Sequence, residues 1–325
     1  MPKSCRLPRV VVASLLLCAA TVAGCDNDDN LSPPAPNEPA RPAVDDGTLE
    51  DRAEEGGIEE GTDTEVGVDR SGGTSEIAVI VDSPYSERAL ASFPALIDSV
   101  DSREEIDLVV HIGDIKSGDS LCSDEWYRQV RQLFASFEDP LIFTPGDNEW
   151  TDCHRPNNGS YDPVERLDAL RGIFFDEPGL AIGGVKRVRA QDDFPENQLW
   201  FESDVAFATV HEVGSNNGLT PRYEDRESPE GYARRLAALE ARDAANVAWL
   251  QETFALAERE GAAGVALFLH ADMWRPAGRL EGDRMDGHQR LVEALAPLVE
   301  RFGRPVLMLS GDSHDYRVDA PVEWF

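Results

Sequence analysis

The chain has 325 residues and a formal net charge of −32, with 62 acidic residues against 30 Lys and Arg. This acidic excess argues against nucleic acid or an anionic membrane surface as a partner, because both repel negative charge. Hydrophobic residues make up 41% of the chain, which is enough for one large globular domain.

The N-terminal segment has the features of an export signal. Three basic residues precede an apolar run over residues 10–23, namely Lys3, Arg6 and Arg9. This run is shorter than the ~20 residues that a membrane span needs. It ends in Val22-Ala23-Gly24-Cys25, which resembles the lipobox of bacterial lipoproteins. The resemblance implies that residues 1–24 are a signal peptide and that Cys25 carries lipid, which anchors the protein outside the cytoplasm, in the periplasm or at the cell surface. The alternative is an ordinary secretory signal with an incidental cysteine.

Residues 25–75 are rich in Pro, Asp, Glu and Gly and contain few large apolar side chains. Such a segment cannot bury enough surface to offset the entropy of ordering it, so we predict a disordered acidic linker. Like charges along it favour an extended spacer between the lipid and the folded domain. The linker thus leaves residues 76–325 as one folded domain, which contacts the membrane through the lipid alone.

From residue 76 onward, short apolar runs alternate with helical patterns, which predicts buried strands in an α/β fold. The predicted strands are residues 77–81, 106–112, 140–144, 199–201, 205–210, 265–269 and 306–309. The predicted helices are residues 86–100, 124–137, 163–175, 234–260 and 289–302. We expect residues 176–198 to be irregular and to shape a pocket.

A potential metal ligand follows five of the predicted strands. These residues are Asp82, Asp114, Asp147, His270 and, after the last strand, Asp312 with His314. The carboxyl ends of strands in α/β sheets face one common crevice, so we expect these side chains to converge. Carboxylates brought together repel one another unless a cation lies between them, and Asp and His are ordinary ligands of divalent cations.

The order of these motifs resembles the calcineurin-like metallophosphoesterase superfamily. Its motifs read Asp-x-His, Gly-Asp-x-x-Asp, Gly-Asn-His-Glu, a lone His and Gly-His-x-His, each after a strand. This chain has Asp82-Ser83-Pro84, Gly113-Asp114-Ile115-Lys116-Ser117, Gly146-Asp147-Asn148-Glu149, His270 and Gly311-Asp312-Ser313-His314. The resemblance implies a β-sandwich flanked by helices (αββα) and metal-dependent hydrolysis of phosphate mono- or diesters.

The resemblance also implies two divalent cations. One keeps Asp82, Asp114 and His314, and the second shares Asp114 and adds three ligands: Asp147, His270 and Asp312. Two such cations, about 3.5–4 Å apart, hold phosphoryl oxygens and lower the pKa of a bound water. The many carboxylates favour Mn²⁺, Mg²⁺ or Ca²⁺ over Zn²⁺, and iron stays open as well.

Several letters depart from the family pattern. Pro84 replaces a ligating His, and Asp147 and Asp312 stand where the family has Asn and His. Asn148 replaces the His that assists the leaving group in relatives; it can donate a hydrogen bond to phosphate but no proton. Lys116 is a candidate to neutralise developing charge, and His154 is a candidate proton donor.

These departures support a second hypothesis, a catalytically weak or inactive binding lipoprotein of the same fold. A third is a structural lipoprotein without metal.

Two cysteines remain once Cys5, Cys18 and Cys25 are assigned to the signal and the lipid. Cys122 and Cys153 each lie just beyond a Gly-Asp motif. An even pair in an exported domain predicts a disulfide that ties two site loops together, with two buried free thiols as the alternative.

Other residues near these motifs have simpler expected roles. We expect His111 to be a core residue, His288 to lie on the surface and Asp272 to orient His270. A core and a rim position are both open for His211. The chain ends eleven residues after His314, and domains that it resembles add strands there, so we expect a truncated C-terminus.

Overall fold

The computed structural model describes residues 10–14, 75–219, 227–274 and 286–319. The predicted lipidation site Cys25, and the predicted linker except Ser75, lie outside these ranges. In the described part of the chain, no helix combines the length and the apolar character that crossing a bilayer requires.

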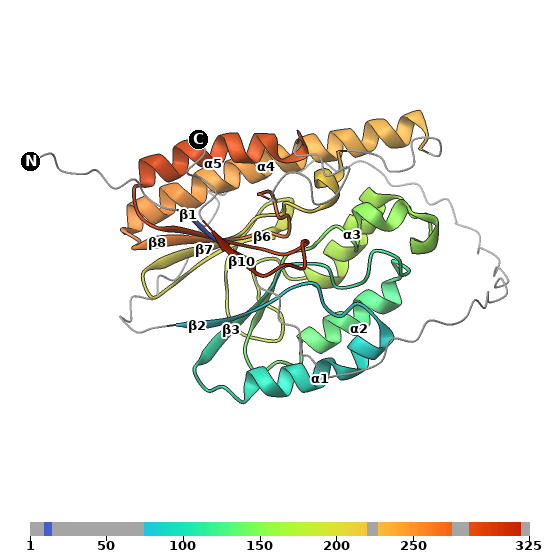
Figure 1. The fold of residues 1–325 in the computed structure, drawn as a ribbon, viewed down its shortest axis with the longest axis horizontal. Helices are drawn as coiled ribbons and strands as arrows, with labels where there is room; N and C mark the ends of the chain where they lie inside the picture. Colours follow the sequence, from blue (N-terminus) through green and yellow to red (C-terminus); the bar gives the residue numbers. More distant parts are fainter. Residues whose placement is uncertain (1–9, 15–74, 220–226, 275–285, 320–325) are drawn as a thin grey trace, which may run out of the picture. The chain divides into compact units, whose positions relative to one another are not determined.

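A three-stranded parallel sheet forms the first half of the domain (Figure 1). Its strands, in spatial order, are β2 (Glu76–Ile80), β3 (Ile106–His111) and β4 (Leu141–Phe143). The helices that pack on its outer face are α1 (Glu87–Asp101), α2 (Asp124–Phe134) and α3 (Pro163–Phe174). Each helix begins at a side chain that accepts a backbone N–H, namely Ser86, Ser123 and Asp162. The capping side chains therefore determine where these three helices begin.

A second, seven-stranded sheet has the order β10-β1-β9-β8-β7-β6-β5. Its strands are β1 (Val10–Ser14), β5 (Arg189–Gln191), β6 (Phe194–Glu202), β7 (Val205–Thr209), β8 (Gly264–Phe268), β9 (Val306–Ser310) and β10 (Arg317–Asp319). Strands β7, β8 and β9 are parallel to one another. One face is covered by α4 (Pro229–Glu260) and α5 (Gln289–Phe302).

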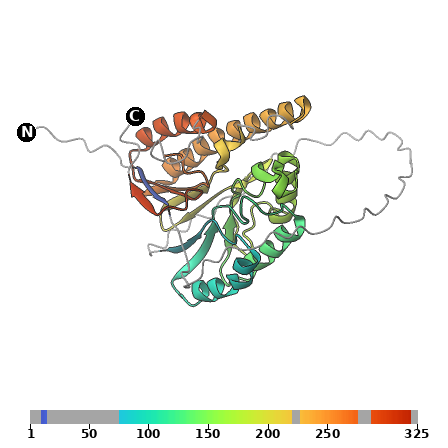
Figure 2. The ribbon, with the colours of Figure 1, turned by 45° about the vertical axis from the view of Figure 1, so that its right-hand side comes forward.

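The two sheets pack face to face, with helices outside each of them (Figures 1 and 2). Leu108, Val110 and Ile142 of the first sheet share one buried apolar cluster with Trp200 and Phe268 of the second. The predicted αββα sandwich is confirmed. Because β2–β4 and β7–β9 all run parallel within their sheets, the loops after these strands supply the site described below.

The region predicted to be irregular contains β5 and the first half of β6. Residues 194–198 read as a loop because they are mostly polar. The fold satisfies these polar groups inside the protein: Glu196 pairs with Arg171, Asn197 donates to Asn246, and Gln198 donates to the Phe143 carbonyl. Buried polar side chains with such partners are compatible with a strand, although no hydrophobic pattern reveals it.

Two further strands were not predicted. Residues Val10–Ser14, assigned above to the signal, form β1 between β9 and β10, and β10 follows the last motif. The remaining predicted helices and strands agree with the structure to within a few residues, the largest difference being α4. It begins five residues before the predicted start, at Pro229, because Ser228 caps it and accepts the N–H of Gly231.

Candidate metal centre

The candidate ligands lie on tight turns directly after their strands. Asp82, Asp114, Asp312 and His314 all have φ between 54° and 66°, in the left-handed region that side chains rarely adopt. Gly113, with φ 86°, lets this turn touch the turn after β4, since a Cβ there would lie 2.3 Å from the Gly146 nitrogen. The fold thus accepts backbone strain where the site is assembled.

The first group of candidate ligands consists of Asp82, Asp114 and His270, whose ligand atoms lie within 4.8 Å of one another. His270 Nε2 is 3.3 Å from Asp114 Oδ1 and 3.5 Å from Asp82 Oδ1. His314 Nε2 lies 3.9 Å from Asp82 Oδ2 and is about half exposed. Asp82 and Asp114 come from the first sheet, whereas His270 and His314 come from the second.

The second group consists of Asp147, His270 and Asp312, also within 4.8 Å of one another. The Nδ1 atom of His270 is 3.9 Å from Asp147 Oδ1 and accepts the N–H of Gly214 at 3.3 Å. The structure therefore brings all the predicted ligands together, with the fully buried His270 between the two groups.

The clustered carboxylates of the site carry more negative charge than the neighbouring side chains balance. Burial, followed by repulsion from the neighbouring Asp147, raises the pKa of Asp312 to about 8. Burial also raises the pKa of Asp114. Burial lowers the pKa of His270, but Asp114 and the other carboxylates outweigh it and leave that pKa well above its usual value. One imidazolium cannot balance these carboxylates.

An unsatisfied acceptor points to the same conclusion. Asp82 Oδ2 is buried and accepts no hydrogen bond from the described residues. A buried charged oxygen without a donor is costly, and a cation removes the cost. Carboxylate oxygens with imidazole nitrogens form a donor set that Mn²⁺, Fe or Zn²⁺ accepts. The residues present fit divalent cations.

Glu149 holds the two turns in register without being a candidate ligand. Its fully buried Oε1 accepts the backbone N–H of Asp114 at 3.1 Å and that of Gly146 at 2.6 Å. Burial, followed by repulsion from Asp114, raises the pKa of Glu149 to about 8. The carboxylate thus links the loops after β3 and β4.

Asn148 contacts the candidate ligand Asp114 directly. Its backbone N–H donates to Asp114 Oδ1 at 3.1 Å, and its side-chain amide donates to Asp114 Oδ2. The amide therefore orients a carboxylate of the first group of candidate ligands. It has no proton to give to a departing alcohol.

Lys116 does not face the site as expected. It is fully buried, and its Nζ donates to the carbonyl oxygens of Ser117 and Asn148 at 2.7 and 2.9 Å. Burial lowers the pKa of this amine. The structure gives Lys116 a role in fixing two loops in place of the predicted contact with phosphate.

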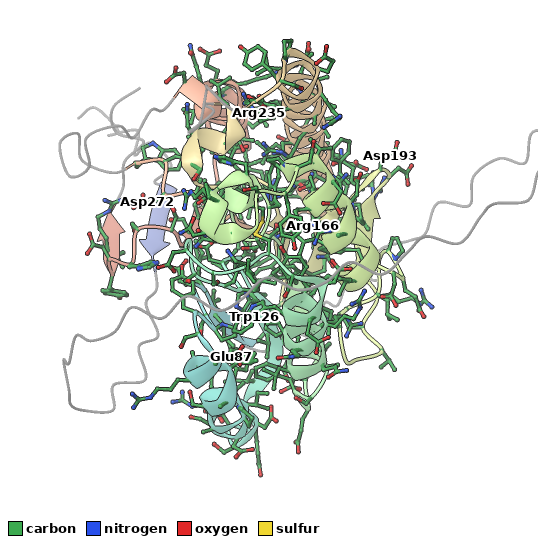
Figure 3. The ribbon with its side chains drawn as sticks, turned by 90° about the vertical axis from the view of Figure 1, so that its right-hand side faces the viewer. Glu87, Trp126, Arg166, Asp193, Arg235 and Asp272 are labelled. Carbon is green, nitrogen blue, oxygen red and sulfur yellow. A yellow bond between two sulfur atoms is a disulfide. The ribbon has the colours of Figure 1, made fainter. Side chains whose placement is uncertain are left out.

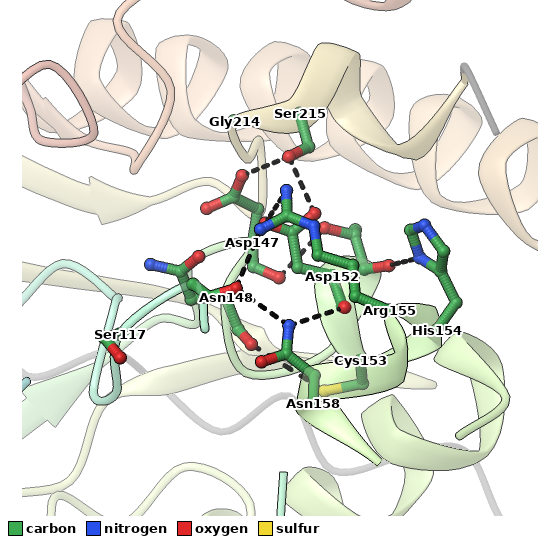
Figure 4. Close-up of polar contacts among 12 residues, drawn as sticks. Ser117, Asp147, Asn148, Asp152, Cys153, His154, Arg155, Asn158, Gly214 and Ser215 are labelled. Atoms are coloured by element: carbon green, nitrogen blue, oxygen red, sulfur yellow. Dashed lines mark hydrogen bonds and ion pairs between the residues drawn. The ribbon is translucent and has the colours of Figure 1, made fainter. Parts of the chain in front are cut away.

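His154 also lies apart from the carboxylates. Figure 4 shows its ring on the far side of Arg155 from Asn148, with Nδ1 2.5 Å from the Thr151 carbonyl oxygen. The ring lines the cavity described below. His154 is close to Asn148 in sequence, but the 3-10 helix Thr151–His154 places its ring against the Thr151 carbonyl oxygen instead.

Ser215 is a site residue to which the sequence pattern assigned no role of its own. Its hydroxyl oxygen lies 2.5 Å from Asp147 Oδ2 and 3.0 Å from Asp152 Oδ1 (Figure 4). The preceding Gly214 permits this approach, since a Cβ there would lie 2.5 Å from Asp312 Oδ1. The only signal was the turn-rich Gly-Ser-Asn-Asn-Gly segment after β7.

A cavity of about 370 Å³ lies beside Ser215, whose hydroxyl group contacts the candidate ligand Asp147. Ser215, Thr151 and Asp152 lie on its wall, so it reaches the site at these residues. Apolar side chains make up much of the rest, including those of Trp150, Tyr161, Val164, Leu167 and Leu239. Arg234, Arg235 and Arg242 also contribute to the lining.

The predicted disulfide is present. Cys122 and Cys153 are bonded, with Cα atoms 5.8 Å apart, and they join the loops after β3 and β4 across 31 residues (yellow in Figure 3). In the chain-entropy model, a loop of this length stabilises the fold by roughly 3–4 kcal/mol. The bridge therefore holds two loops that carry candidate ligands.

The structure confirms the predicted position of His111, decides that of His211 and contradicts that of His288. His111 is a core residue, packed on Phe134, as predicted. His211 is also fully buried, with Nδ1 2.8 Å from Glu196 Oε1, which decides between the core and the rim. The surface prediction for His288 is wrong, because its ring is buried against Glu212 at 2.7 Å.

Asp272 does not orient His270 in the way we predicted. Its carboxylate instead receives a hydrogen bond from Arg317 at 2.9 Å, and this pair joins the loop after β8 to β10.

A model of the calcineurin-like phosphoesterase family matches residues 86–316, well over half of the chain. No curated protein matches the sequence significantly. The match begins at the cap of α1 and continues past His314, so it contains every candidate ligand except Asp82. The sandwich of two sheets and the carboxylates and histidines after their strands agree with this match, and the chain belongs to the calcineurin-like phosphoesterase family.

Proposed function

We propose that this protein is an exported, lipid-anchored hydrolase of phosphate mono- or diesters that uses two divalent cations. The observation that carries the proposal is the convergence of Asp82, Asp114, Asp147, His270, Asp312 and His314 from loops of both sheets. Bound cations supply charge neutralisation for a phosphoryl group and a water of lowered pKa.

The protein's own groups have defined roles in this proposal. Asp114 is the carboxylate shared by both cations, and Asn148 orients it through two hydrogen bonds. Gly214 fixes the His270 ring through its N–H, and Ser215 positions Asp147. Asp114, Asp147 and His270 are therefore each held by a second contact, as expected where precise geometry matters.

The cavity supports the binding of the organic part of the ester. It begins at Ser215, beside the carboxylates, and has Trp150, Tyr161 and Leu239 on its walls. Apolar and aromatic walls favour a substrate with an aromatic or other apolar group.

The leaving group sets the expected substrate range. No imidazole stands at position 148, and general acid catalysis typically contributes 10²–10⁴-fold. We therefore expect esters of acidic phenols to react, and esters of simple alkanols to react at least about 100-fold more slowly.

The assay uses chelator-treated protein reloaded with Mn²⁺, Mg²⁺, Ca²⁺, Fe²⁺ or Zn²⁺. Nitrophenyl mono- and diesters of phosphate are compared with the corresponding alkyl esters. Metal-dependent release of nitrophenol is the expected result. Two bound cations without turnover of any ester favour the alternative, a binding lipoprotein of the same fold. Two departures from the family pattern support this alternative: Pro84 replaces a ligating His, and Asn148 replaces the His that assists the leaving group. Absence of bound metal contradicts the hydrolase and favours a binding or structural lipoprotein without metal.

Export and anchoring rest on the sequence of the first 25 residues. We expect the protein to fractionate with membranes and to incorporate labelled fatty acid when it is produced in a bacterial host. A Cys25→Ser variant is expected to lose the label, whereas a Cys18→Ser variant, which alters a residue of the predicted signal, keeps it. Equal labelling of both variants, or none in the wild type, contradicts lipidation at Cys25.

A further inference from the structure

The hydroxyl group of Tyr85 lies among the candidate ligands of the first cation. Its oxygen is 2.8 Å from Asp114 Oδ2, 3.0 Å from His314 Nε2 and 3.3 Å from Asp82 Oδ1. Three ligand atoms from three separate loops thus meet at one phenol oxygen. No family motif quoted above contains this tyrosine.

Neighbouring residues fix the ring in this position. Tyr85 follows the buried Pro84 and precedes Ser86, which caps α1 by accepting the N–H of Ala89 at 3.2 Å. The Tyr85 and His314 rings lie 5.4 Å apart. Glu87, labelled in Figure 3, marks the start of α1 two residues later. Tyr85 therefore lies in a short segment between a buried proline and the cap of α1, with its ring beside that of His314.

The distances match those between ligands that share an ion. Ligand atoms lie about 2.0–2.2 Å from cations such as Zn²⁺ or Mg²⁺, so two ligands at right angles are about 3 Å apart. The three distances from Tyr85 lie around this value. A hydrogen bond donated to Asp114 and one accepted from His314 account for two of these distances, but the single phenol proton cannot also satisfy Asp82 Oδ1.

We propose that the Tyr85 phenol oxygen coordinates the same cation as Asp82 and Asp114, in place of the imidazole that position 84 lacks. This inference rests on the proposed function, since it adds a ligand to the same site. On binding, the oxygen–metal bond forms and the phenol proton passes to solvent. The first cation then has two carboxylates, one phenolate and His314, a hard, anionic set for which Fe³⁺ can serve as a spectroscopic probe.

A spectroscopic test separates coordination from hydrogen bonding. Full-length, chelator-treated protein is loaded with Fe³⁺ as its nitrilotriacetate complex, and the visible spectrum is recorded. A phenolate bound to Fe³⁺ gives a charge-transfer band, whereas a hydrogen-bonded phenol gives none. We expect the band in the wild type, its loss in Tyr85→Phe, and its retention in Tyr316→Phe, a control at a position that is 68% exposed.

Zn²⁺ affinity, measured by competition with a chromophoric chelator, gives a second readout. Loss of one ligand is expected to weaken binding by at least about 10-fold in Tyr85→Phe and to leave Tyr316→Phe unchanged. The wild-type spectrum itself is decisive even if Tyr85→Phe folds poorly. Bound iron without the band overturns the role of Tyr85 and leaves the proposed function intact, whereas a wild type that binds no cation overturns both.

Discussion

Replacing Asp114 with Asn is expected to reduce turnover by at least about 10³-fold and to lower the number of bound cations from two to at most one. Asp114 is the only carboxylate assigned to both cations. It also accepts hydrogen bonds from Tyr85 and from the backbone and side chain of Asn148. An amide keeps the shape of the side chain but loses the charge that binds the ions, so the effect on metal binding exceeds the effect on folding.

Stability gives this variant a distinctive signature. Without metal, burial and the neighbouring Asp147 disfavour the Asp114 charge, so Asp114→Asn is expected to be as stable as the wild type or more stable. With Mn²⁺ the order reverses, because the wild type gains binding energy that the variant lacks.

A matched control lies in the same loop. Asp119 is exposed and contacts Ser117 at 2.6 Å, so Asp119→Asn is expected to leave turnover and metal content unchanged. Turnover of Asp114→Asn within 10-fold of the wild type contradicts the assignment. Metal content by mass spectrometry, initial rates and urea unfolding are the measurements.

Removal of the metal is expected to make stability depend on pH between 7 and 9. The pKa values of Glu149 and Asp312 are raised to about 8 in the metal-free fold, from ordinary values of 4.5 and 3.8. The folded state therefore binds protons in this range that the unfolded chain does not, and stability rises as the pH falls through 8. The two groups together contribute about 2–3 kcal/mol between pH 9 and pH 7.

Bound cations change this dependence. A cation keeps Asp312 ionised, so the pH dependence weakens, and a ligand at 1,000 times its Kd stabilises the fold by about 4 kcal/mol. Urea unfolding at pH 7 and pH 9, with chelator and with Mn²⁺, measures both effects while the disulfide stays oxidised.

The variant Glu149→Gln tests the contribution of one group. The amide oxygen can still accept the N–H groups of Asp114 and Gly146, but the side chain no longer titrates. We expect it to remove about half of the pH dependence in chelator. Equal stability of the metal-free wild type at pH 7 and pH 9 would show that these carboxylates are not strained by their surroundings.

The sequence was sufficient to predict the candidate ligands that directly follow strands. Strands β2, β3, β8 and β9 are apolar runs, and their carboxyl ends are followed by Asp82, Asp114, His270 and Asp312. Buried strands have a clear hydrophobic signal, and sheet topology determines where their ends lie. For these four residues, the position directly after a buried strand was enough to predict that the side chain lies at the site.

Contacts that depend on tertiary packing could not be predicted in the same way. Lys116 follows a Gly-Asp motif, yet the fold buries its amine between two carbonyl groups. Tyr85 and Ser215 belong to turns whose direction is set by left-handed backbone or by caps, not by hydrophobic pattern. Strand β6 was partly missed because buried hydrogen bonds, rather than apolar side chains, hold Glu196 and Asn197.

The site draws its ligands from both sheets, and this has a consequence for cooperativity. Asp82, Asp114 and Asp147 belong to one layer of the sandwich, while His270, Asp312 and His314 belong to the other. Neither sheet carries all the ligands of the site. A cation bound by ligands from both sheets therefore stabilises the packing of one sheet on the other. Leu108, Trp200 and Phe268 belong to the apolar cluster between the two sheets. Substitutions there therefore affect how tightly the cation is bound, even though these side chains are not ligands.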